Sequence, residues 1–503
     1  MPHPPITRRL FATASVAAAT LARTGPAQAA ERVLTVGASV FPDSLLPGSS
    51  SFQSESLLHQ TNEALFERDN GGNIIPALAL SATQIDDTTT RIALRPGVKC
   101  HDGGAFTAED VVFTIAYVLD PKNAYGTLAR IAQVSGAVAV DPLTVDITTK
   151  AAFPTLLKGL SFIVMQVKRY HEKVGVKGVT ARPMGTGPFM FVKWSAGDRY
   201  ELTAFKDHWG GIPAFDRLVF REIPDAGTRV ASLVSGETDI IEEVPVDLIP
   251  QVAQSGTAKM DEIVSSAALV LTYDVRVPPF NDPRVRLAFD LAVDKAAIRQ
   301  EILKDRGELL HGQLLVSGTF GFNPALQARP FDPAKARALL TEAGYDFKTP
   351  IPIVCQSGKY VSDVDIANAA AGMLSNIGVA ASVNVVEGGV FLQMQNAFKM
   401  GPIHMIGWYS LGDADFANVW YTKGGRRATW LNEEYERLFV EARSTNDRAV
   451  REGKYMRMAE ILHEENPSMF LVGLPSLYGV GTRVRNFGAA SDKCIRVAKV
   501  TLA

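Results

Sequence analysis

The amino-acid sequence predicts an α/β protein built from more than one domain. A strand-like run at 351–355 is followed by a helix-like run at 366–377 and a second strand-like run at 379–386. Gly378 is a residue at which helices commonly end, so it marks the boundary between the helix-like run and the second strand-like run. This β-α-β order is typical of sheets covered by helices. The 503 residues also exceed what one compact core usually accommodates.

The first 29 residues are predicted to be an export signal that the mature protein lacks. T-R-R-L-F at 7–11 resembles a twin-arginine motif, an Ala-rich apolar stretch follows, and A-Q-A at 27–29 fits a cleavage site. The apolar stretch is shorter than the roughly 20 residues that a membrane-spanning helix needs. We therefore expect cleavage near Ala29, a mature chain of 503 − 29 = 474 residues and a soluble periplasmic protein.

The mature chain is mildly acidic. The full sequence contains 51 Lys and Arg residues and 53 Asp and Glu residues. Removal of residues 1–29 removes three arginines and no acidic residue, so the balance becomes 48 − 53 = −5. This charge argues against a nucleic-acid or anionic-membrane partner.

The three cysteines, Cys100, Cys355 and Cys494, lie far apart in the sequence. An odd number leaves at least one thiol without a partner in the chain. Buried free thiols are the favoured interpretation, and a Cys355–Cys494 bridge stays open as the alternative.

Strand-like and helix-like segments alternate through the first third of the chain. Residues 33–37 look like a strand, 56–66 have apolar residues at helical spacing, and 91–98 look like a strand that enters a turn. Thr107 and Asp110 have the spacing of a capping box, which predicts a helix that continues to residue 119.

Aspartate–proline pairs predict two helix starts later in the chain. Asp282 and Asp332 each precede a proline, which suits the first helical position. The second of these helices should close on Gly344. A last long helix is expected at about 448–466, because Pro467 follows it.

Several motifs resemble those of one family, the bacterial extracellular solute-binding proteins of family 5. The most informative is R-I-A-L-R-P-G-V-K-C-H-D-G-G-A-F-T-A-E-D-V-V-F at 91–113. Further motifs follow in the order of the family, and the resemblance extends over nearly the whole mature chain. They are G-T-G-P-F at 185–189, H-W-G-G-I-P at 208–213, G-E-T-D-I at 236–240 and P-P-F-N-D-P-R-V-R-L-A at 278–288.

The resemblance implies the two-lobed periplasmic-binding-protein fold of the class II type, with an extra subdomain in the first lobe. Two strands are expected to cross between the lobes, near 265–273 and near 472–480. The expected divisions are 30–268 with 478–503 for lobe 1, about 51–184 for the extra subdomain, and 269–477 for lobe 2.

The resemblance also implies a receptor of an ABC importer. Such a receptor captures a di- or oligopeptide between its lobes and delivers it to permease subunits in the inner membrane. Receptors for an opine, organic acid, sugar or nickel chelate remain alternatives, and a periplasmic hydrolase on this fold is a remote one. The sequence has no nucleophile elbow and no Walker A loop. We expect a monomer without cofactor, metal or catalytic residues.

The family's G-W pair, here Gly407-Trp408, ends a strand of the second lobe. The tryptophan commonly lines the ligand pocket in the family, so the resemblance implies that Trp408 and the adjacent Tyr409 contact the ligand. A pocket residue should contribute little to the stability of the empty protein. Trp408 is therefore expected to lie outside the hydrophobic core.

A departure from the family occurs three residues after this tryptophan. Peptide-binding members have an aspartate there that holds the α-amino group of the peptide, whereas this chain has Leu411. Two interpretations stay open. Either a two-residue insertion gives Asp413, with Asp415 close by, the same role, or the site has lost its ammonium partner and binds a non-peptide solute.

Two more candidates come from the resemblance. Arg426 would suit a carboxylate or phosphate by bidentate hydrogen bonding, although a solvated surface role is the alternative. Tyr125 lies where members of the family reach the ligand from the extra subdomain, although core packing explains most aromatic residues equally well. His404 and Met405 are interpreted as strand residues and not as metal ligands.

Overall fold

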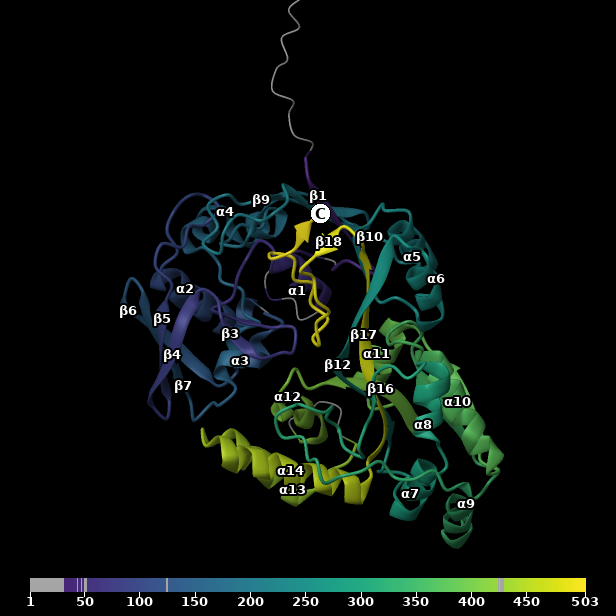
Figure 1. Ribbon diagram of the computed structural model, residues 1–503. Helices are drawn as coiled ribbons and strands as arrows, with labels where there is room; N and C mark the ends of the chain where they lie inside the picture. The colour runs from purple at the N-terminus through teal and green to yellow at the C-terminus, as the bar shows by residue number, and fades with distance from the viewer. Residues whose placement is uncertain are drawn as a thin grey trace, which may run out of the picture.

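The protein is an α/β structure of two stacked lobes joined by long strands (Figure 1). The predicted α/β class is therefore confirmed. None of the helices in the described ranges combines the length and apolar character that spanning a bilayer requires. The predicted signal at 1–29 lies outside these ranges. The computed structural model describes residues 31–42, 44–46, 48, 52–123, 125–423, 425 and 429–503.

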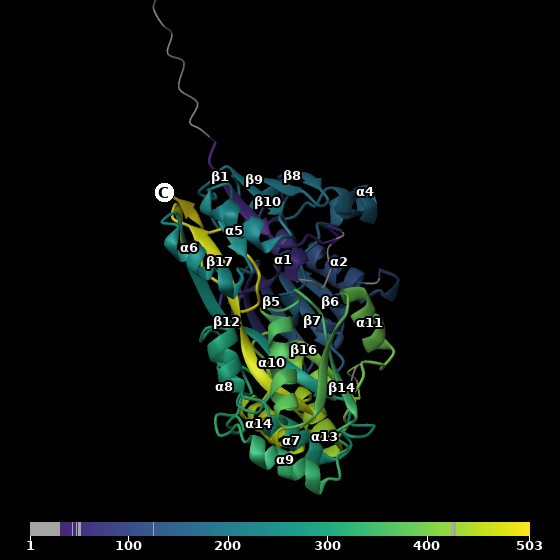
Figure 2. The ribbon, with the colours of Figure 1, turned by 90° about the vertical axis from the view of Figure 1, so that its right-hand side faces the viewer.

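One sheet, eleven-stranded over the described residues, runs through both lobes. Its two longest strands, β12 (Ala258–Tyr273) and β17 (Ser468–Gly481), pair antiparallel along most of their length. Figures 1 and 2 show both strands passing from one lobe into the other. They include the segments at 265–273 and 472–480 that were expected to cross between the lobes.

On the first-lobe side, the sheet continues from β17 through five more strands. The strand predicted at 33–37 is present and pairs parallel with β10 and β11. These strands are β11 (Ile240–Glu242), β1 (Val33–Ala38), β10 (Arg217–Glu222), β9 (Arg199–Ala204) and β8 (Phe189–Ser195). Helix α5 (Ala226–Val234) follows β10 in the chain, and helix α6 (Ile249–Gln254) follows β11.

On the second-lobe side, β16 (Ile403–Tyr409) pairs antiparallel with β12. Next to it, β14 (Pro350–Cys355) and β15 (Ala380–Val385) run parallel to each other. Parallel neighbours need a crossover, which α10 (Asp363–Asn376) supplies. The β-α-β unit predicted at 351–386 is thereby confirmed.

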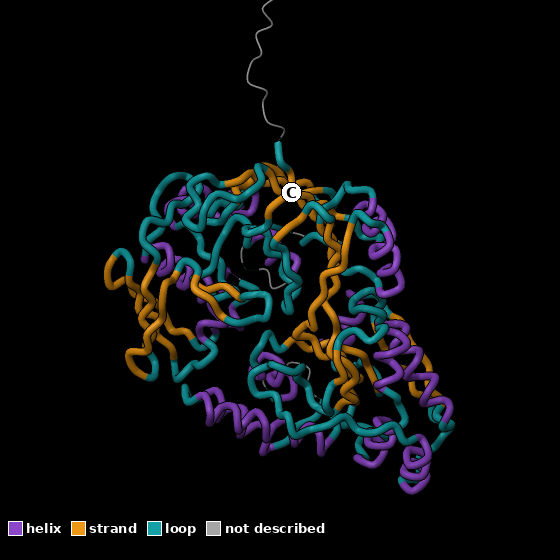
Figure 3. The backbone as a smooth tube through the Cα atoms, viewed as in Figure 1, coloured by secondary structure: helices purple, strands orange, loops and turns teal. Residues whose placement is uncertain are grey.

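A separate antiparallel sheet lies beside the first lobe, within the range expected for the extra subdomain (Figure 3). Its strands enclose a core with α2, in which Ile92, Val111 and Val145 are fully buried. The elements are β4 (Ala79–Asp86), β5 (Thr89–Leu94), β7 (Thr144–Thr149), β6 (Val134–Asp141), α2 (Ala108–Leu119), α3 (Leu156–Leu160) and α4 (Lys168–Ala181).

The second lobe has a hydrophobic core on each face of the sheet. Side chains alternate along β12, so that Leu269 and Leu271 enter one core while Ala268 and Val270 enter the other. Helices α7 (Pro283–Leu291), α9 (Pro333–Glu342) and α10 pack on the first core. Helices α13 (Glu433–Arg443) and α14 (Arg448–Glu465) pack on the second.

The predicted helix ends are confirmed by their caps. The carboxylates of Asp282 and Asp332 accept hydrogen bonds from backbone amides at the starts of α7 and α9. Asp110 accepts from the Thr107 amide at 2.9 Å, as a capping box requires. Gly344 follows α9 with a φ of +70°, a conformation that favours glycine.

The helix predicted at 56–66 is wrong in its second half. Helix α1 (Phe52–Leu58) ends at Leu58, and Ala64 instead forms a strand-like bridge with Val164. Strand β2 (Phe66–Arg68) follows and pairs with β3 (Ile74–Pro76). Leu57, Ala64 and Phe66 are all buried. A short helix followed by a short strand therefore buries the same apolar residues that a single helix would have buried.

All three cysteines are buried free thiols, as favoured from the sequence. The alternative Cys355–Cys494 bridge is not formed, since Cys355 lies in β14 of the second lobe and Cys494 near the C-terminus in the first. Burial raises the pKa of Cys100 and of Cys355 to about 11. These thiols are therefore protonated at neutral pH.

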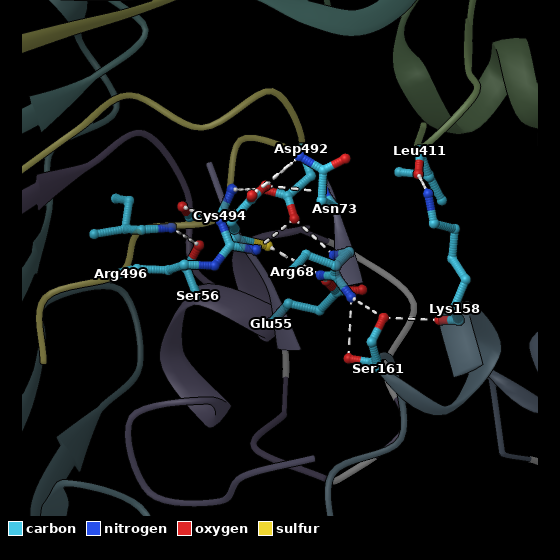
Figure 4. A network of polar contacts seen from close by, with 12 residues as sticks. Glu55, Ser56, Arg68, Asn73, Lys158, Ser161, Leu411, Asp492, Cys494 and Arg496 are labelled. Atoms are coloured by element: carbon cyan, nitrogen blue, oxygen red, sulfur yellow. Dashed lines mark hydrogen bonds and ion pairs between the residues drawn. The ribbon is translucent and has the colours of Figure 1, made fainter. Parts of the chain in front are cut away.

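A buried charge network ties the C-terminal segment to α1 and β2 (Figure 4). The Arg68 guanidinium binds Glu55 and Asp492, each at 2.7 Å, and the three side chains are between 2% and 6% exposed. Arg496 also binds Asp492, at 2.5 Å. Burial alone would raise the pKa of Asp492, but Arg496 and Arg68 outweigh it and hold that pKa well below its usual range.

We predict that Arg68→Met lowers the free energy of unfolding by about 3–5 kcal/mol, because Glu55 and Asp492 would remain buried without their shared cation. The matched control is Arg91→Met in the same lobe. Arg91 pairs with Asp146 at 2.8 Å on the surface and should contribute less than about 1 kcal/mol. Urea unfolding of both variants measures the difference, and equally small losses would contradict a supporting role for the network.

Candidate functional site

A cleft of about 620 Å³ lies between the two lobes. The first lobe contributes Asn73, Ile74 and α3, and the second contributes the loop at 318–324, Gly412 and the start of α14. Small-molecule sites commonly measure about 300–1,000 Å³. The charged residues that line the cleft are Lys158, Asp413, Arg448, Arg451 and Glu452.

One hydrogen bond joins the lobes beside this cleft. Lys158 Nζ on α3 donates to the backbone carbonyl of Leu411 at 2.7 Å (Figure 4). Close by, a Cβ atom at Gly412 would lie 2.7 Å from that Nζ and 3.4 Å from the carbonyl oxygen of Gly72. The Phe162 ring of the first lobe also lies 6.3 Å from the Phe416 ring of the second. The lobes are therefore in contact at this edge.

Leu411 takes the position at which peptide-binding members of the family have an aspartate. Its φ is +51°, a left-handed conformation that costs a leucine about 1–2 kcal/mol. The side chain is buried, and the backbone carbonyl faces Lys158. This position thus supplies a backbone acceptor to the other lobe and no carboxylate.

Asp413, the predicted replacement for that aspartate, does line the cleft. Its carboxylate caps α12 (Ala414–Asn418) by accepting from the Asp415 amide at 3.0 Å. The same carboxylate accepts two hydrogen bonds from Arg451, at 3.1 and 3.2 Å. Arg451 thereby neutralises Asp413, and a direct bond from Asp413 to a ligand ammonium stays a prediction.

Asp415 is not among the residues that line the cleft. It is buried, where it accepts a hydrogen bond from the Tyr455 hydroxyl at 3.0 Å and pairs with Arg443 at 2.9 Å. Burial raises the pKa of Asp415, and Arg443 opposes that shift. These contacts hold α12 against α13 and α14.

Trp408 is a member of the second-lobe core, contrary to the expectation that it lies outside it. The indole is 7% exposed and stacks on Trp420, with ring centroids 4.8 Å apart and an interplanar angle of 17°. Its position on β16 was predicted correctly. A contact between Trp408 and a ligand stays a prediction.

Tyr409 is half-buried at the end of β16, opposite Ala267 of β12. On its other side, β16 pairs with β14 only at Ile403 and His404. Residues 405–409 therefore present an edge that no named strand of the described chain occupies. The Tyr360 ring lies against Gly407 at this edge, where an added Cβ atom would be 2.6 Å from it.

The two other candidates lie apart from the cleft lining or outside the described chain. Tyr125 is 5% exposed in the core of the extra subdomain, where its ring packs edge-on against Tyr117. It also fills the space beside Gly48. Arg426 lies outside the described residues. Contacts of Tyr125 and Arg426 with a ligand stay predictions.

Among the cleft residues that sequence reasoning missed are Lys158, Arg448, Arg451 and Phe320. The guanidinium groups of Arg448 and Arg451 lie over the Phe320 ring, at 4.4 and 4.8 Å from its centroid. The helix predicted at 448–466 placed both arginines on one face, because positions i and i+3 are neighbours. Nothing in the sequence around Lys158 indicates that α3 lies opposite them.

The loop between β18 (Val484–Arg485) and β19 (Thr501–Leu502) reaches from the C-terminus toward the second lobe (Figure 1). Ser491 at its tip is hydrogen-bonded to Asn70 and to Ser266 of β12, both at 2.8 Å. Lys493 then pairs with Glu243 at 3.2 Å. Both residues of this pair have positive φ, at 62° and 52°, so two strained backbones meet beside the crossing strands.

His404 and Met405 lie within β16, as predicted. Over the described ranges, no group of three or more His, Cys, Asp or Glu side chains is placed to hold a metal ion.

The family model for the bacterial extracellular solute-binding proteins, family 5 (middle region) matches residues 73–427. The chain belongs to this family. Two curated relatives of this family 5 protein are named glutathione-binding protein GsiB. The one from Pectobacterium atrosepticum is 26% identical over 488 residues, which cover 93% of this chain and 93% of that protein. The one from Salmonella typhimurium is 27% identical over 471 residues, covering 89% and 90%.

Solved structures confirm the two-lobed fold of this solute-binding protein. The periplasmic binding protein DppA from Helicobacter pylori, in complex with the peptide STSA, matches with a TM-score of 0.81 at 22% identity, over 94% of this chain and 98% of that chain. NikZ from Campylobacter jejuni, in complex with Ni(L-His), matches with a TM-score of 0.83 at 22% identity, over 93% and 99%.

We predict that Trp408→Ala lowers the free energy of unfolding of the empty protein by about 3–5 kcal/mol, because the stack on Trp420 is lost and a cavity opens in the core. Trp408→Phe, which keeps an aromatic ring on Trp420, should lose less. Thermal unfolding measures both variants. An alanine variant that melts within a few degrees of the parent would place Trp408 outside the core.

We also predict that Gly412→Ala breaks the Lys158–Leu411 contact between the lobes, because the added Cβ would lie 2.7 Å from Lys158 Nζ and displace the flexible end of that side chain. The matched control is Gly103→Ala, whose φ of +83° is similar to the +81° of Gly412 but whose Cβ would have open space. Both variants should lose about 1 kcal/mol or more of stability from the backbone conformation. Only Gly412→Ala should increase the radius of gyration in small-angle scattering, and equal radii would contradict this contact.

Proposed function

We propose that this chain is the substrate receptor of an ABC importer for short peptides of the glutathione class. Curated relatives named as glutathione-binding proteins match it over about nine-tenths of both chains. A structural neighbour was solved with a peptide bound. The interlobe cleft of about 620 Å³ has a volume suited to a ligand of this size.

The edge of β16 at residues 405–409, which no named strand of the described chain pairs with, is the observation that carries the peptide assignment. Beyond His404, its backbone has β12 on one side and no named strand of the described chain on the other. An extended peptide can add to such an edge through main-chain hydrogen bonds. The Tyr360 side chain against Gly407 is a group that an incoming backbone can displace.

Ligand capture works through lobe closure in this proposal. Residues 30–268 with 478–503 act as one body, 269–477 act as the other, and the extra subdomain at about 51–184 moves with the first. β12 and β17 serve as the hinge. The ligand shifts the equilibrium to the closed state only because it binds that state more tightly than the open one. The permease then recognises the closed state. The ligand is bound and released without turnover.

The setting follows from the predicted export signal. Residues 1–29 direct the chain to the periplasm through the twin-arginine route and are removed near Ala29. The mature chain acts as a monomer, without a nucleic-acid partner, and delivers its ligand to permease subunits in the inner membrane. The acidic mature charge of 48 − 53 = −5 supports the absence of a nucleic-acid partner.

A non-peptide organic acid is the second candidate ligand. It is favoured by the absence of a free carboxylate at the position of Leu411 and by the engagement of Asp413 with Arg451. Both features weaken the attraction of this edge of the site for an ammonium group.

Native mass spectrometry of the mature protein, purified from its producing cells, tests the proposal directly. Release and fragmentation of the bound material should yield a short peptide or glutathione. A single organic acid, sugar or metal chelate without peptide bonds would replace the peptide assignment with the second candidate or another solute. Release of a chemically converted product from added peptide would contradict the binding-only role.

A further inference from the structure

The ammonium group of Lys158 is unusual among the charges at the lobe interface. It is half-buried, yet among the described residues it donates one hydrogen bond, to the Leu411 carbonyl, although an ammonium can donate three. In the described part of the chain, no carboxylate lies within ion-pair distance of Lys158. Burial lowers the pKa of Lys158, while Asp413 opposes that shift from a distance.

The second lobe presents another cation to the same cleft. Arg448 stands on the first turn of α14 and is exposed, with its guanidinium 4.4 Å from the centre of the Phe320 ring. The ring fixes one face of the guanidinium and leaves its N–H groups at the edge. Over the described residues, Arg448 forms no ion pair within 4 Å.

The charges that line the cleft leave these two cations unbalanced. Arg451 and Asp413 neutralise each other through their two hydrogen bonds. Lys158 and Arg448 then face a single further acid, Glu452, one helical turn after Arg448. Lys158 belongs to the first lobe and Arg448 to the second, so two positive charges line the cleft from opposite sides. Partly buried like charges repel, unless an anion lies between them.

We propose that the cleft selects ligands with a free carboxylate, which Lys158 and Arg448 bind from opposite lobes. The carboxylate supplies the counter-charge that closure requires, and Arg448 offers the planar pair of donors that a carboxylate accepts. Asp413 acts behind this site by holding Arg451 and the start of α12. The inference rests on the proposed receptor function and names the ligand group that this edge of the site recognises.

Isothermal titration with matched acid and amide ligands tests the proposal on the mature protein. The probes are reduced glutathione with its diethyl ester, and trialanine with its C-terminal amide. Each free acid should bind about tenfold or more tightly than its ester or amide, because only the carboxylate forms ion pairs with the two cations. Lys158→Met and Arg448→Gln should each weaken binding of the acids much more than binding of the ester or amide, and so remove most of this preference.

Two control variants match the chemistry outside the cleft. Lys150 lies in the same subdomain and also donates to one backbone carbonyl, that of Ala132 at 3.1 Å, but it is exposed. Arg437 is an exposed arginine of α13 in the second lobe, with Glu441 at 3.8 Å. Lys150→Met and Arg437→Gln should leave the acid preference unchanged. Thermal unfolding of all four variants verifies that each is folded.

The outcomes separate this inference from the proposed function. Equal binding of acids and amides to the parent protein overturns the inference and leaves the peptide assignment standing. A Lys158→Met variant that weakens the binding of acids and amides equally also overturns it, and makes Lys158 a closure contact only.

If the parent protein binds none of the probes, the ligand released in native mass spectrometry replaces them. A non-peptide acid that depends on Lys158 supports the inference and rejects the peptide, whereas a ligand without a free carboxylate overturns the inference.

Discussion

The antiparallel pairing of β12 with β17 is the constraint on which the arrangement of this protein depends. Because these two strands belong to both lobes, every hydrogen bond between them also fixes the distance between the lobes. The register shifts between Val264 and Ala268, near the point where the chain passes from one lobe to the other. Irregular pairing at that point leaves fewer hydrogen bonds to oppose bending. The first lobe has a core of its own, whereas another hydrophobic cluster extends from α5 and α6 of the first lobe into the second lobe.

The buried charges around Arg68 set the geometry on the first-lobe side of the cleft. Arg68 binds Glu55, Asp492 and Ser161, and Ser161 in turn hydrogen-bonds the backbone of Lys158 at 2.7 Å. The position of α3 is thus linked to the same network that anchors the C-terminal loop. Removing charges from water is unfavourable unless they are well paired, so such a network specifies one arrangement more than it adds stability. This network holds Lys158 at the position where it contacts the second lobe.

Local patterns predicted the elements whose stability is itself local. The caps at Asp282 and Asp332 and the β-α-β order at 351–386 are read within a few residues, and the structure contains them. The helix expected at 56–66 failed because burial of its apolar residues does not require helical geometry. Trp408 was placed on the correct strand, but which face of the sheet it covers depends on α12 and Trp420, which fold against it from later in the chain.

The sequence by itself determined the family, the α/β class, most helix starts and the strands that cross between the lobes. Only the tertiary structure decided which charges meet. Lys158 reaches the Leu411 carbonyl across 253 positions, and Asp413 is matched by Arg451 across 38. Coulombic and hydrogen-bond energies depend on distance in space and on burial, and neither is encoded in the spacing of single residues. The carboxylate at Asp413 was visible in the sequence, whereas its pairing with Arg451 and the position of Lys158 in the opposite lobe were not.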